Sequence, residues 1–450
     1  MKAFVEGAGC SLNKADTGQI QGILLQNGYS LAEKPEKADL IILNTCAVKE
    51  QTEAKMLKRI RQLHKISQKK KIPLIVFGCL PKINPAAISA ISKSIVQIGP
   101  SLELLCDFLQ LPQKCFSPET EEKHSGSTIA ILPIARGCLG NCAYCCVKNA
   151  RGPLKSYPIP VLEKKFRKLL SSHKAFFASQ NIEKQKLFVP RKPAGLLGSL
   201  GKNCASHREI WLTAQDCGCY GFDNGTNLVE LLKTLLRNKG DFRIRIGMVN
   251  PGHLKGFLRD YVSLFEDRRL YRFFHLPVQS GSNAVLAAMN RPYKREDFLR
   301  IAKEIRECFP DASISTDIIA GFPGETESQF NESVSLVQAA MPDVVNISRF
   351  GCRPNTLAAA MPGQLHGREK KKRSRLLSLL CREISLQRNS RLVGTVQEIL
   401  LDEKGKGNTV VGRSQDYKPV VLQKGRLGAF AKVEIKKAFP THLLGVAFGK

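Results

Sequence analysis

The segment IAILPIARGCLGNCAYCCVKNARG, residues 129–152, joins an apolar run to a dense group of cysteines. Residues 129–136 predict a strand, and Cys138, Cys142 and Cys145, called here the loop triad, follow in a C-x₃-C-x₂-C spacing. Three thiolates on one loop can bind three irons of a four-iron, four-sulfur cube and leave the fourth iron open. A structural zinc site normally takes four ligands. The spacing therefore favours an iron–sulfur cluster, with zinc or structural thiols as alternatives.

The same order of apolar run and polar loop recurs through residues 128–386. Repeated units of a strand and a helix are typical of a full or partial barrel, in which the chemistry lies at the C-terminal ends of the strands. The expected strands are IAILPIAR (129–136), EIWLTAQD (209–216), RIRIGMVN (243–250), RFFHLPVQ (272–279), SISTDIIAGF (313–322) and VVNISRF (344–350).

Residues 1–116 alternate between apolar runs and helical patterns, which predicts a parallel, Rossmann-like sheet. Helices are expected at 14–27 and 49–66, and strands near the start, at 39–46 and at 73–79. Each of these three strands ends on a cysteine: Cys10, Cys46 and Cys79, called here the strand-end triad. Because the carboxyl ends of parallel strands share one edge of a sheet, we expect these thiols to converge as metal ligands. Buried apolar cysteines remain the alternative.

The last part of the chain, residues 387–450, predicts a small antiparallel β module that is barrel-like. A polar linker at 117–127 and a helix beginning in the basic segment 366–375 complete the organisation. A basic β module attached to an enzyme often binds RNA, although solvated charges would look the same. The candidate RNA contacts in the module are Lys404, Lys406, Arg413, Lys436 and Lys437.

The composition agrees with a partner of negative charge. The chain has 69 Lys and Arg against 39 Asp and Glu, for a formal net charge of +30. Such a surplus favours nucleic acid, because contacts with phosphates release counterions. No signal peptide or membrane-spanning run is evident, so we expect a cytoplasmic protein without a membrane partner. In that compartment thiols stay reduced, and 15 cysteines indicate metal binding or catalysis.

The loop triad, with Tyr144 before its last cysteine, resembles the radical S-adenosylmethionine superfamily. The whole chain is similar to its methylthiotransferase family, and several motifs resemble the archaeal and eukaryotic enzymes that act on N6-threonylcarbamoyladenosine. The motifs that carry this resemblance are GCSLNKAD (9–16), LNTCAV (43–48), FGCLP (77–81), KNARGPLKSYP (148–158), EIWLTAQD (209–216), HLPVQSGS (275–282), MNRPY (289–293) and TDIIAGFPGET (316–326). The terminal module resembles the TRAM domain.

The resemblance implies an α/β fold in three parts: a Rossmann-like domain, a partial barrel of radical S-adenosylmethionine type and a TRAM-like β-barrel. It implies two [4Fe-4S] clusters, an auxiliary one on the strand-end triad and a radical-generating one on the loop triad. One S-adenosylmethionine then supplies a methyl group and another a radical. Gln215, Asp216, Gln279 and Asp317 are candidates for cofactor binding, and Lys148 and Arg151 for phosphate contacts.

The implied reaction converts N6-threonylcarbamoyladenosine at position 37 of tRNA, beside the anticodon, to its 2-methylthio derivative. The implied partners are tRNA, an electron donor of flavodoxin or ferredoxin type and a sulfur donor. Two alternatives remain: a sibling enzyme that modifies an aspartate of a ribosomal protein, and a non-catalytic RNA-binding protein with metal.

One segment departs from the family pattern. Residues 171–207 form a basic insertion with several Pro and Gly, which predicts a surface excursion. Four further cysteines near the expected site, Cys146, Cys204, Cys217 and Cys219, receive no role from the sequence.

Overall fold

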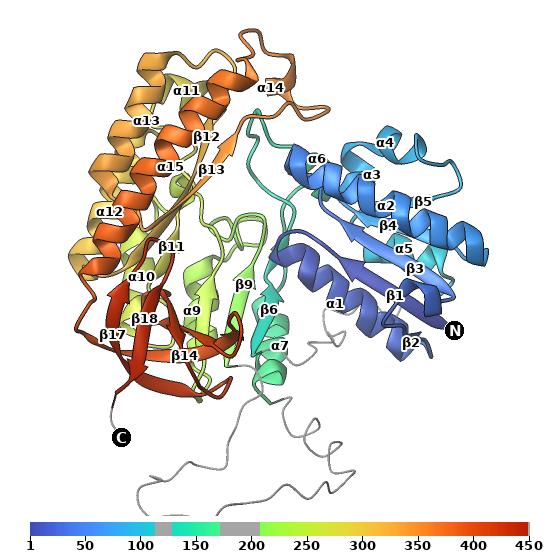
Figure 1. Ribbon diagram of the computed structural model, residues 1–450, viewed down its shortest axis with the longest axis horizontal. Helices are drawn as coiled ribbons and strands as arrows, with labels where there is room; N and C mark the ends of the chain where they lie inside the picture. The colour runs from blue at the N-terminus through green and yellow to red at the C-terminus, as the bar shows by residue number, and fades with distance from the viewer. Residues whose placement is uncertain (113–127, 172–207, 449–450) are drawn as a thin grey trace, which may run out of the picture.

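The computed structural model describes residues 1–112, 128–171 and 208–448. The predicted linker 117–127 and nearly all of the predicted insertion lie outside these residues. Figure 1 shows an N-terminal α/β unit on the right, a central unit of strands covered by helices on the left, and a small β-barrel below the central unit. This is the three-part α/β architecture predicted from the sequence.

The N-terminal unit is a five-stranded parallel sheet of order β2-β1-β3-β4-β5. Every residue of β3 is buried, because helices cover both faces of the sheet. Its elements are β1 (Lys2–Gly7), α1 (Ser11–Gln26), β2 (Ser30–Leu31), η1 (Pro35–Lys37), β3 (Leu40–Thr45), α2 (Glu50–Lys70), β4 (Leu74–Gly78), α3 (Leu80–Ile83), α4 (Pro85–Ser89), β5 (Val96–Ile98) and α5 (Leu102–Phe108).

The central unit contains all six predicted strands, in two parallel three-stranded sheets of order β10-β9-β6 and β11-β12-β13. A parallel bridge between Ile244 and Leu270 joins them. No pairing between β6 and β13 is recorded in the described part of the chain, so the barrel is partial. One apolar core lies between the strands and their helices.

The elements of the central unit, in chain order, are β6 (Ile129–Pro133), β7 (Ala135–Arg136), α6 (Val147–Arg151), β8 (Lys155–Ser156), α7 (Ile159–Ser171), β9 (Glu209–Thr213), α9 (Leu228–Leu236), β10 (Arg243–Ile246), η3 (Pro251–His253), α10 (Leu258–Ser263), η4 (Leu264–Glu266), β11 (Phe273–His275), α11 (Asn283–Ala288), α12 (Arg295–Cys308), β12 (Ser313–Ala320), α13 (Glu327–Ala340), β13 (Val344–Arg349), α14 (Leu357–Ala360) and α15 (Gly367–Ser390).

The C-terminal module is a closed barrel of order β14-β15-β16-β18-β17. The predicted antiparallel pairing holds for all neighbours except β16 and β18, which run parallel. The parallel pair arises because β17 pairs with β14, so that the chain returns beside β16 in the same direction. The strands are β14 (Val396–Lys404), β15 (Val410–Ser414), β16 (Pro419–Leu422), β17 (Phe430–Ala438) and β18 (Leu443–Ala447).

Helix α15 begins at Gly367, in the basic segment where the sequence predicts a helix. It packs along β13 and also contacts the C-terminal barrel through β17, so one helix connects the two units. Among the described residues, no helix combines the length and the apolar character needed to cross a bilayer.

Candidate functional site

The loop triad lies on the turn between β7 and α6, and two glycines shape that turn. Gly137 has a φ of +70°, and a Cβ at this position would lie 1.8 Å from the carbonyl oxygen of Pro153. Only glycine fits so close a backbone approach. The backbone nitrogen of Gly140 donates a hydrogen bond to Cys138 Sγ at 3.3 Å. The loop is therefore folded around its sulfur atoms.

The electrostatics of the loop triad fit a cationic cluster. Burial, together with the nearby charges of Asp216 and the other two cysteines, raises the pKa of the Cys138 thiol to about 11. Burial also raises the pKa of Cys142, while the guanidinium of Arg291 opposes that shift. Three thiolates in this position need a compensating cation, because a metal ligand must be deprotonated. The loop triad can therefore bind metal ions, and its spacing suits the irons of a cluster.

Arg291 is a site residue to which the sequence analysis gave no role. Its guanidinium lies 5.7 Å from the ring centre of Tyr144 in the cysteine loop and 5.6 Å from that of Tyr293. Its Nε is buried without a hydrogen-bond partner among the described residues. The motif MNRPY contains this arginine, but only the fold reveals that it lies beside the loop triad.

The strand-end triad converges as the parallel sheet predicts. Cys10, Cys46 and Cys79 follow β1, β3 and β4, which are neighbours in the sheet. Burial, with smaller contributions from the charges of Cys46 and Cys10, raises the pKa of the Cys79 thiol to about 11. At Gly9 a Cβ would lie 2.7 Å from Cys46 Cβ. The three thiols therefore lie together at one edge of the sheet, and their role as ligands remains a prediction.

Asn13, at the start of α1, ties the strand-end triad together. Its Nδ2 donates to the carbonyl oxygens of Ala8 and Thr45, at 3.1 and 2.9 Å, next to the cysteines of two strands. Its Oδ1 accepts from the Cys10 thiol at 3.5 Å. The asparagine is 1 % exposed, so these bonds are shielded from water.

Arg151 occupies a different place from the one expected. Its side chain is 2 % exposed, and its Nη2 lies 2.7 Å from Asp16 Oδ2 and 2.9 Å from Asn13 Oδ1. The guanidinium opposes the burial-driven rise in the pKa of Cys79. The expectation that Arg151 contacts phosphate is therefore corrected, because the side chain is enclosed beside the strand-end triad. Lys148, on the same helix, is half-buried.

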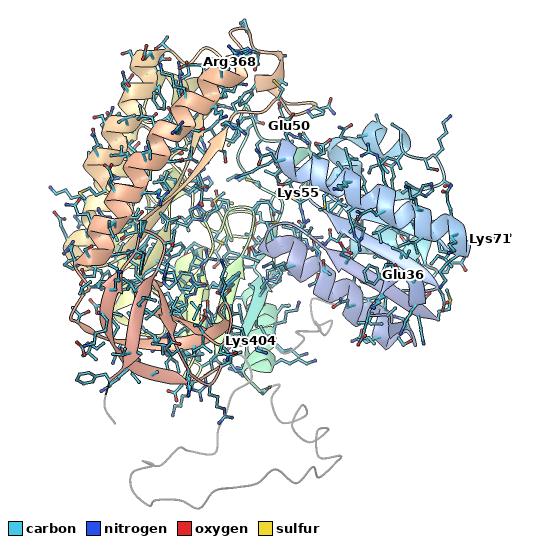
Figure 2. All side chains as sticks on the ribbon, in the orientation of Figure 1. Glu36, Glu50, Lys55, Lys71, Arg368 and Lys404 are labelled. Atoms are coloured by element: carbon cyan, nitrogen blue, oxygen red, sulfur yellow. The ribbon has the colours of Figure 1, made fainter. Side chains whose placement is uncertain are left out.

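The two triads meet at the junction of the N-terminal and central units. Cys146, directly after the loop triad, and Ala150 of α6 are buried in the same apolar cluster as Cys79. Nearby, Arg353, from the loop after β13, forms a buried ion pair with Glu53 of α2. Figure 2 shows the neighbouring residue Glu50 at the end of α2 that faces the central unit. Cys46 and Cys79 are thus buried beside segments of the central unit, whereas Cys10 is exposed.

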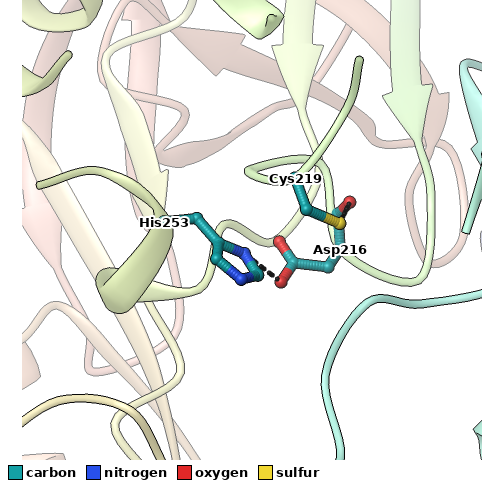
Figure 3. Close-up of side chains that lie close together, drawn as sticks. All are labelled: Asp216, Cys219 and His253. Carbon is teal, nitrogen blue, oxygen red and sulfur yellow. Dashed lines mark hydrogen bonds and ion pairs between the residues drawn. The ribbon is translucent and has the colours of Figure 1, made fainter. Parts of the chain in front are cut away.

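Asp216 lies beside the loop triad within a compact polar group, drawn in Figure 3. Its Oδ2 lies 2.9 Å from His253 Nδ1, and the thiol of Cys219 donates to its carbonyl oxygen at 3.4 Å. Its Oδ1 accepts from the backbone nitrogens of Gly218 and Asn250, at 2.9 and 3.1 Å. The ligand atoms of Asp216, Cys219 and His253 lie within 4.8 Å of one another. Oδ1 is thus satisfied by two backbone N–H groups, whereas the contact of Oδ2 with His253 Nδ1 is an ion-pair distance without hydrogen-bond geometry.

The other cofactor candidates also lie at or near strand ends. The side-chain oxygen of Gln215 is buried without a partner among the described residues. Gln279 has a φ of +75°, and its backbone nitrogen donates to the Asp317 carbonyl oxygen at 2.8 Å. Burial alone would raise the pKa of Asp317, but hydrogen bonds from His275 and Asn346 hold it below its ordinary value. Asp317 therefore stays ionised near neutral pH.

The basic candidates of the barrel divide into two groups. Arg413 is engaged within the protein, with Nε 3.1 Å from Asp402 Oδ2 and Nη2 2.7 Å from Glu403 Oε2. It is therefore better explained as a structural residue than as a phosphate contact. The exposed candidates are Lys404, Lys406, Lys436 and Lys437. Figure 2 shows Lys404 at the lower end of the molecule, opposite Arg368 at the upper end.

Comparisons with known proteins match this architecture part by part. Family models match residues 2–98 (Uncharacterized protein family UPF0004), 132–337 (Radical SAM superfamily) and 390–448 (TRAM domain). A curated protein of Pyrococcus horikoshii, "Probable threonylcarbamoyladenosine tRNA methylthiotransferase", is 38 % identical over 99 % of both chains. The chain belongs to the radical S-adenosylmethionine methylthiotransferase family. A relative with the same name in Pyrococcus abyssi is also 38 % identical, again over 99 % of both chains.

A solved structure supports the fold of this methylthiotransferase family member. The radical S-adenosylmethionine methyltransferase TsrM from Kitasatospora setae aligns with a TM-score of 0.55 at 11 % identity, over 80 % of this chain and 76 % of that one. Family membership implies S-adenosylmethionine and an iron–sulfur cluster, and the loop triad fits such a cluster. The prediction of the family and of its three-part fold is thus confirmed.

Proposed function

We propose that this methylthiotransferase acts on tRNA and converts N6-threonylcarbamoyladenosine at position 37 to its 2-methylthio derivative. The observation that carries the proposal is the juxtaposition of two cysteine triads at one domain junction. Relatives named threonylcarbamoyladenosine tRNA methylthiotransferase, similar over the full length, support the nucleoside. The C-terminal barrel supports RNA as the substrate, because its exposed lysines can contact phosphates.

The proposed enzyme holds two [4Fe-4S] clusters, one on each triad. When bound, the clusters and S-adenosylmethionine supply the radical, the sulfur and the methyl group that an unactivated C–H bond requires. The chain's residues position these groups: Gly137 and Gly140 shape the cysteine loop, and Asn13 ties two strand ends of the second triad. The candidates for cofactor binding are Gln215 and Asp216 after β9, Gln279 after β11 and Asp317 within β12.

The remaining partners follow from the chemistry. An electron donor of flavodoxin or ferredoxin type reduces the cluster of the loop triad, and a sulfur donor restores the auxiliary cluster after each turnover. A tRNA substrate favours the cytoplasm as the site of the reaction. A ribosomal-protein substrate is less favoured, because the relatives' names point to tRNA. A non-catalytic RNA-binding protein with metal is less favoured, because each triad offers three thiols and a structural metal site normally takes four ligands.

The test is mass spectrometry of nucleosides from bulk tRNA in cells that lack the gene. We expect the 2-methylthio derivative to disappear, its unmethylthiolated precursor to accumulate, and the wild-type gene to restore it. A matched strain carries Cys138→Ala, which removes one cluster ligand without deleting the protein. An unchanged nucleoside profile in the deletion strain would contradict the tRNA assignment, and a protein residue would then be the next target.

A further inference from the structure

Arg151 is a buried cation that shares its carboxylate partner. Asp16 is 1 % exposed and pairs with two arginines, Arg136 at 3.1 Å and Arg151 at 2.7 Å. The charge of Glu103 also acts on Arg136, whose side chain is 20 % exposed, whereas the side chain of Arg151 is 2 % exposed. A buried cation is costly unless an anion lies beside it. The surroundings of Arg151 therefore favour a further negative charge next to its guanidinium.

The positively charged guanidinium of Arg151 lies beside the strand-end triad. Its Nη2 forms an ion pair with Asp16 and donates a hydrogen bond to Asn13 Oδ1. Its Nη1 is buried and has no hydrogen-bond partner among the described residues. Arg151 Nη2 and the Cys10 thiol both donate to Asn13 Oδ1, at 2.9 and 3.5 Å, which places the guanidinium at the triad. Its charge opposes the burial-driven rise in the pKa of Cys79 and of Cys46. A buried arginine with an available N–H beside a cysteine sulfur is arranged to donate to a thiolate.

A four-iron cluster held by three thiolates gains negative charge on reduction. Hydrogen bonds and charges near the sulfur atoms set the reduction potential of such clusters. A cation next to Cys79 stabilises the reduced, more negative state. We propose that Arg151 is a positioning residue of the auxiliary cluster: it donates to the Cys79 sulfur and raises the cluster's reduction potential. This inference rests on the auxiliary cluster of the proposed function.

The placement of Arg151 links the two triads through one chain segment. Arg151 follows the loop triad by only a few residues along α6, yet its side chain serves the other triad. The segment that carries the radical-generating cluster therefore completes the site of the auxiliary one. Lys148, about one helical turn earlier on α6, offers a matched control, because its substitution removes the same charge from the same helix.

The experiment uses the full chain with Cys138→Ala, Cys142→Ala and Cys145→Ala, so that only the auxiliary cluster is loaded. Into this background go Arg151→Lys, Arg151→Met and the control Lys148→Met. Iron and sulfide per chain, the electron paramagnetic resonance spectrum of the reduced cluster and its midpoint potential are measured, together with the affinity for tRNA. Arg151→Met should lower the potential and change the spectrum, Arg151→Lys should restore part of the potential, and Lys148→Met should leave both unchanged.

The outcomes distinguish a failure of the auxiliary cluster from a failure of the role proposed for Arg151. If the background protein binds no iron, the auxiliary cluster fails, and the role of Arg151 fails with it. If the cluster is loaded but neither Arg151→Met nor Arg151→Lys changes its potential or spectrum, the inference alone is overturned. If the Arg151 variants bind tRNA more weakly while the midpoint potential of the cluster is unchanged, Arg151 contacts phosphate and the inference is overturned. If Arg151→Met loses its iron, the Arg151→Lys variant is used instead: a changed potential supports the inference, and an unchanged potential overturns it.

Discussion

The two cysteine triads differ in how the chain brings them together. The loop triad lies within residues 138–145 on one turn, whereas the strand-end triad spans residues 10–79 and depends on the order β1-β3-β4 in a parallel sheet. Each has a buried arginine from elsewhere in the chain, Arg291 for the first and Arg151 for the second. The comparison teaches that a local triad can be recognised from spacing, whereas a dispersed one needs the fold.

The largest effect is expected when a ligand of one triad is removed, which tests whether the other triad still binds its cluster. Cys138→Ala should abolish reductive cleavage of S-adenosylmethionine, by roughly 10³-fold or more, because the ligands of one cluster act as a unit. The auxiliary cluster should remain, since its ligands lie in another domain. Formation of 5′-deoxyadenosine and iron content per chain measure the two effects. Cys381→Ala, a buried cysteine of the central core, is the control and should keep both.

The reciprocal change should separate cleavage from transfer. Cys79→Ala is expected to lower the yield of methylthiolated nucleoside by more than about 100-fold while 5′-deoxyadenosine still forms, because the loop triad is untouched. The products are measured in one anaerobic assay. Cys106→Ala removes a buried thiol on the opposite face of the same sheet and should leave the nucleoside yield near that of the wild type. Equal loss of both products in Cys79→Ala would mean that the triads do not act separately.

The sequence predicts the loop triad more directly than the strand-end triad. The strand before Cys138 and the spacing after it identify the first triad directly. The strand-end triad could be expected to converge only because each of its cysteines ends a strand of a parallel sheet. Arg353 could not be given a role, because its partner Glu53 lies 300 positions away. Asn13 and Arg291 also have near neighbours in the chain, but their contacts with Thr45 and Tyr144 come only from the fold. Arg151 was misassigned for the same reason: an arginine after a cluster loop looks solvated until Asp16 is seen beside it.

A smaller effect should come from the arginine of the loop triad. Arg291→Lys keeps the charge but loses the planar group that lies over Tyr144 and Tyr293. Cleavage of S-adenosylmethionine should fall by about 10–100-fold, as is common for groups that orient ligands. The midpoint potential of the auxiliary cluster should not move. A shift of that potential would show that Arg291 also acts on the cluster of the strand-end triad, which contradicts the prediction.

The smallest effect is expected for charges outside both triads. The double change Lys404→Ala and Lys406→Ala should weaken tRNA binding about two- to tenfold and reduce the steepness of its salt dependence by about 1.4–1.8, if two phosphate contacts are lost. Fluorescence titration at several salt concentrations measures both quantities. Lys65→Ala with Lys69→Ala, two exposed lysines in the C-terminal part of α2, is the charge-matched control. Equal weakening by the control would argue for a diffuse field instead of contacts at the barrel.

The ion pair between Glu53 and Arg353 has a consequence for the synthesis of the protein. Its partners are 300 positions apart, and their side chains are 9 % and 7 % exposed once paired. At a synthesis rate of about 5–20 residues per second, the last strand of the N-terminal sheet, which ends at Ile98, is synthesised about 13–50 s before Arg353. During that interval Cys46 and Cys79 lack the segments of the central unit that bury them in the finished fold. The nascent N-terminal unit therefore exposes two thiols that the complete protein protects from solvent.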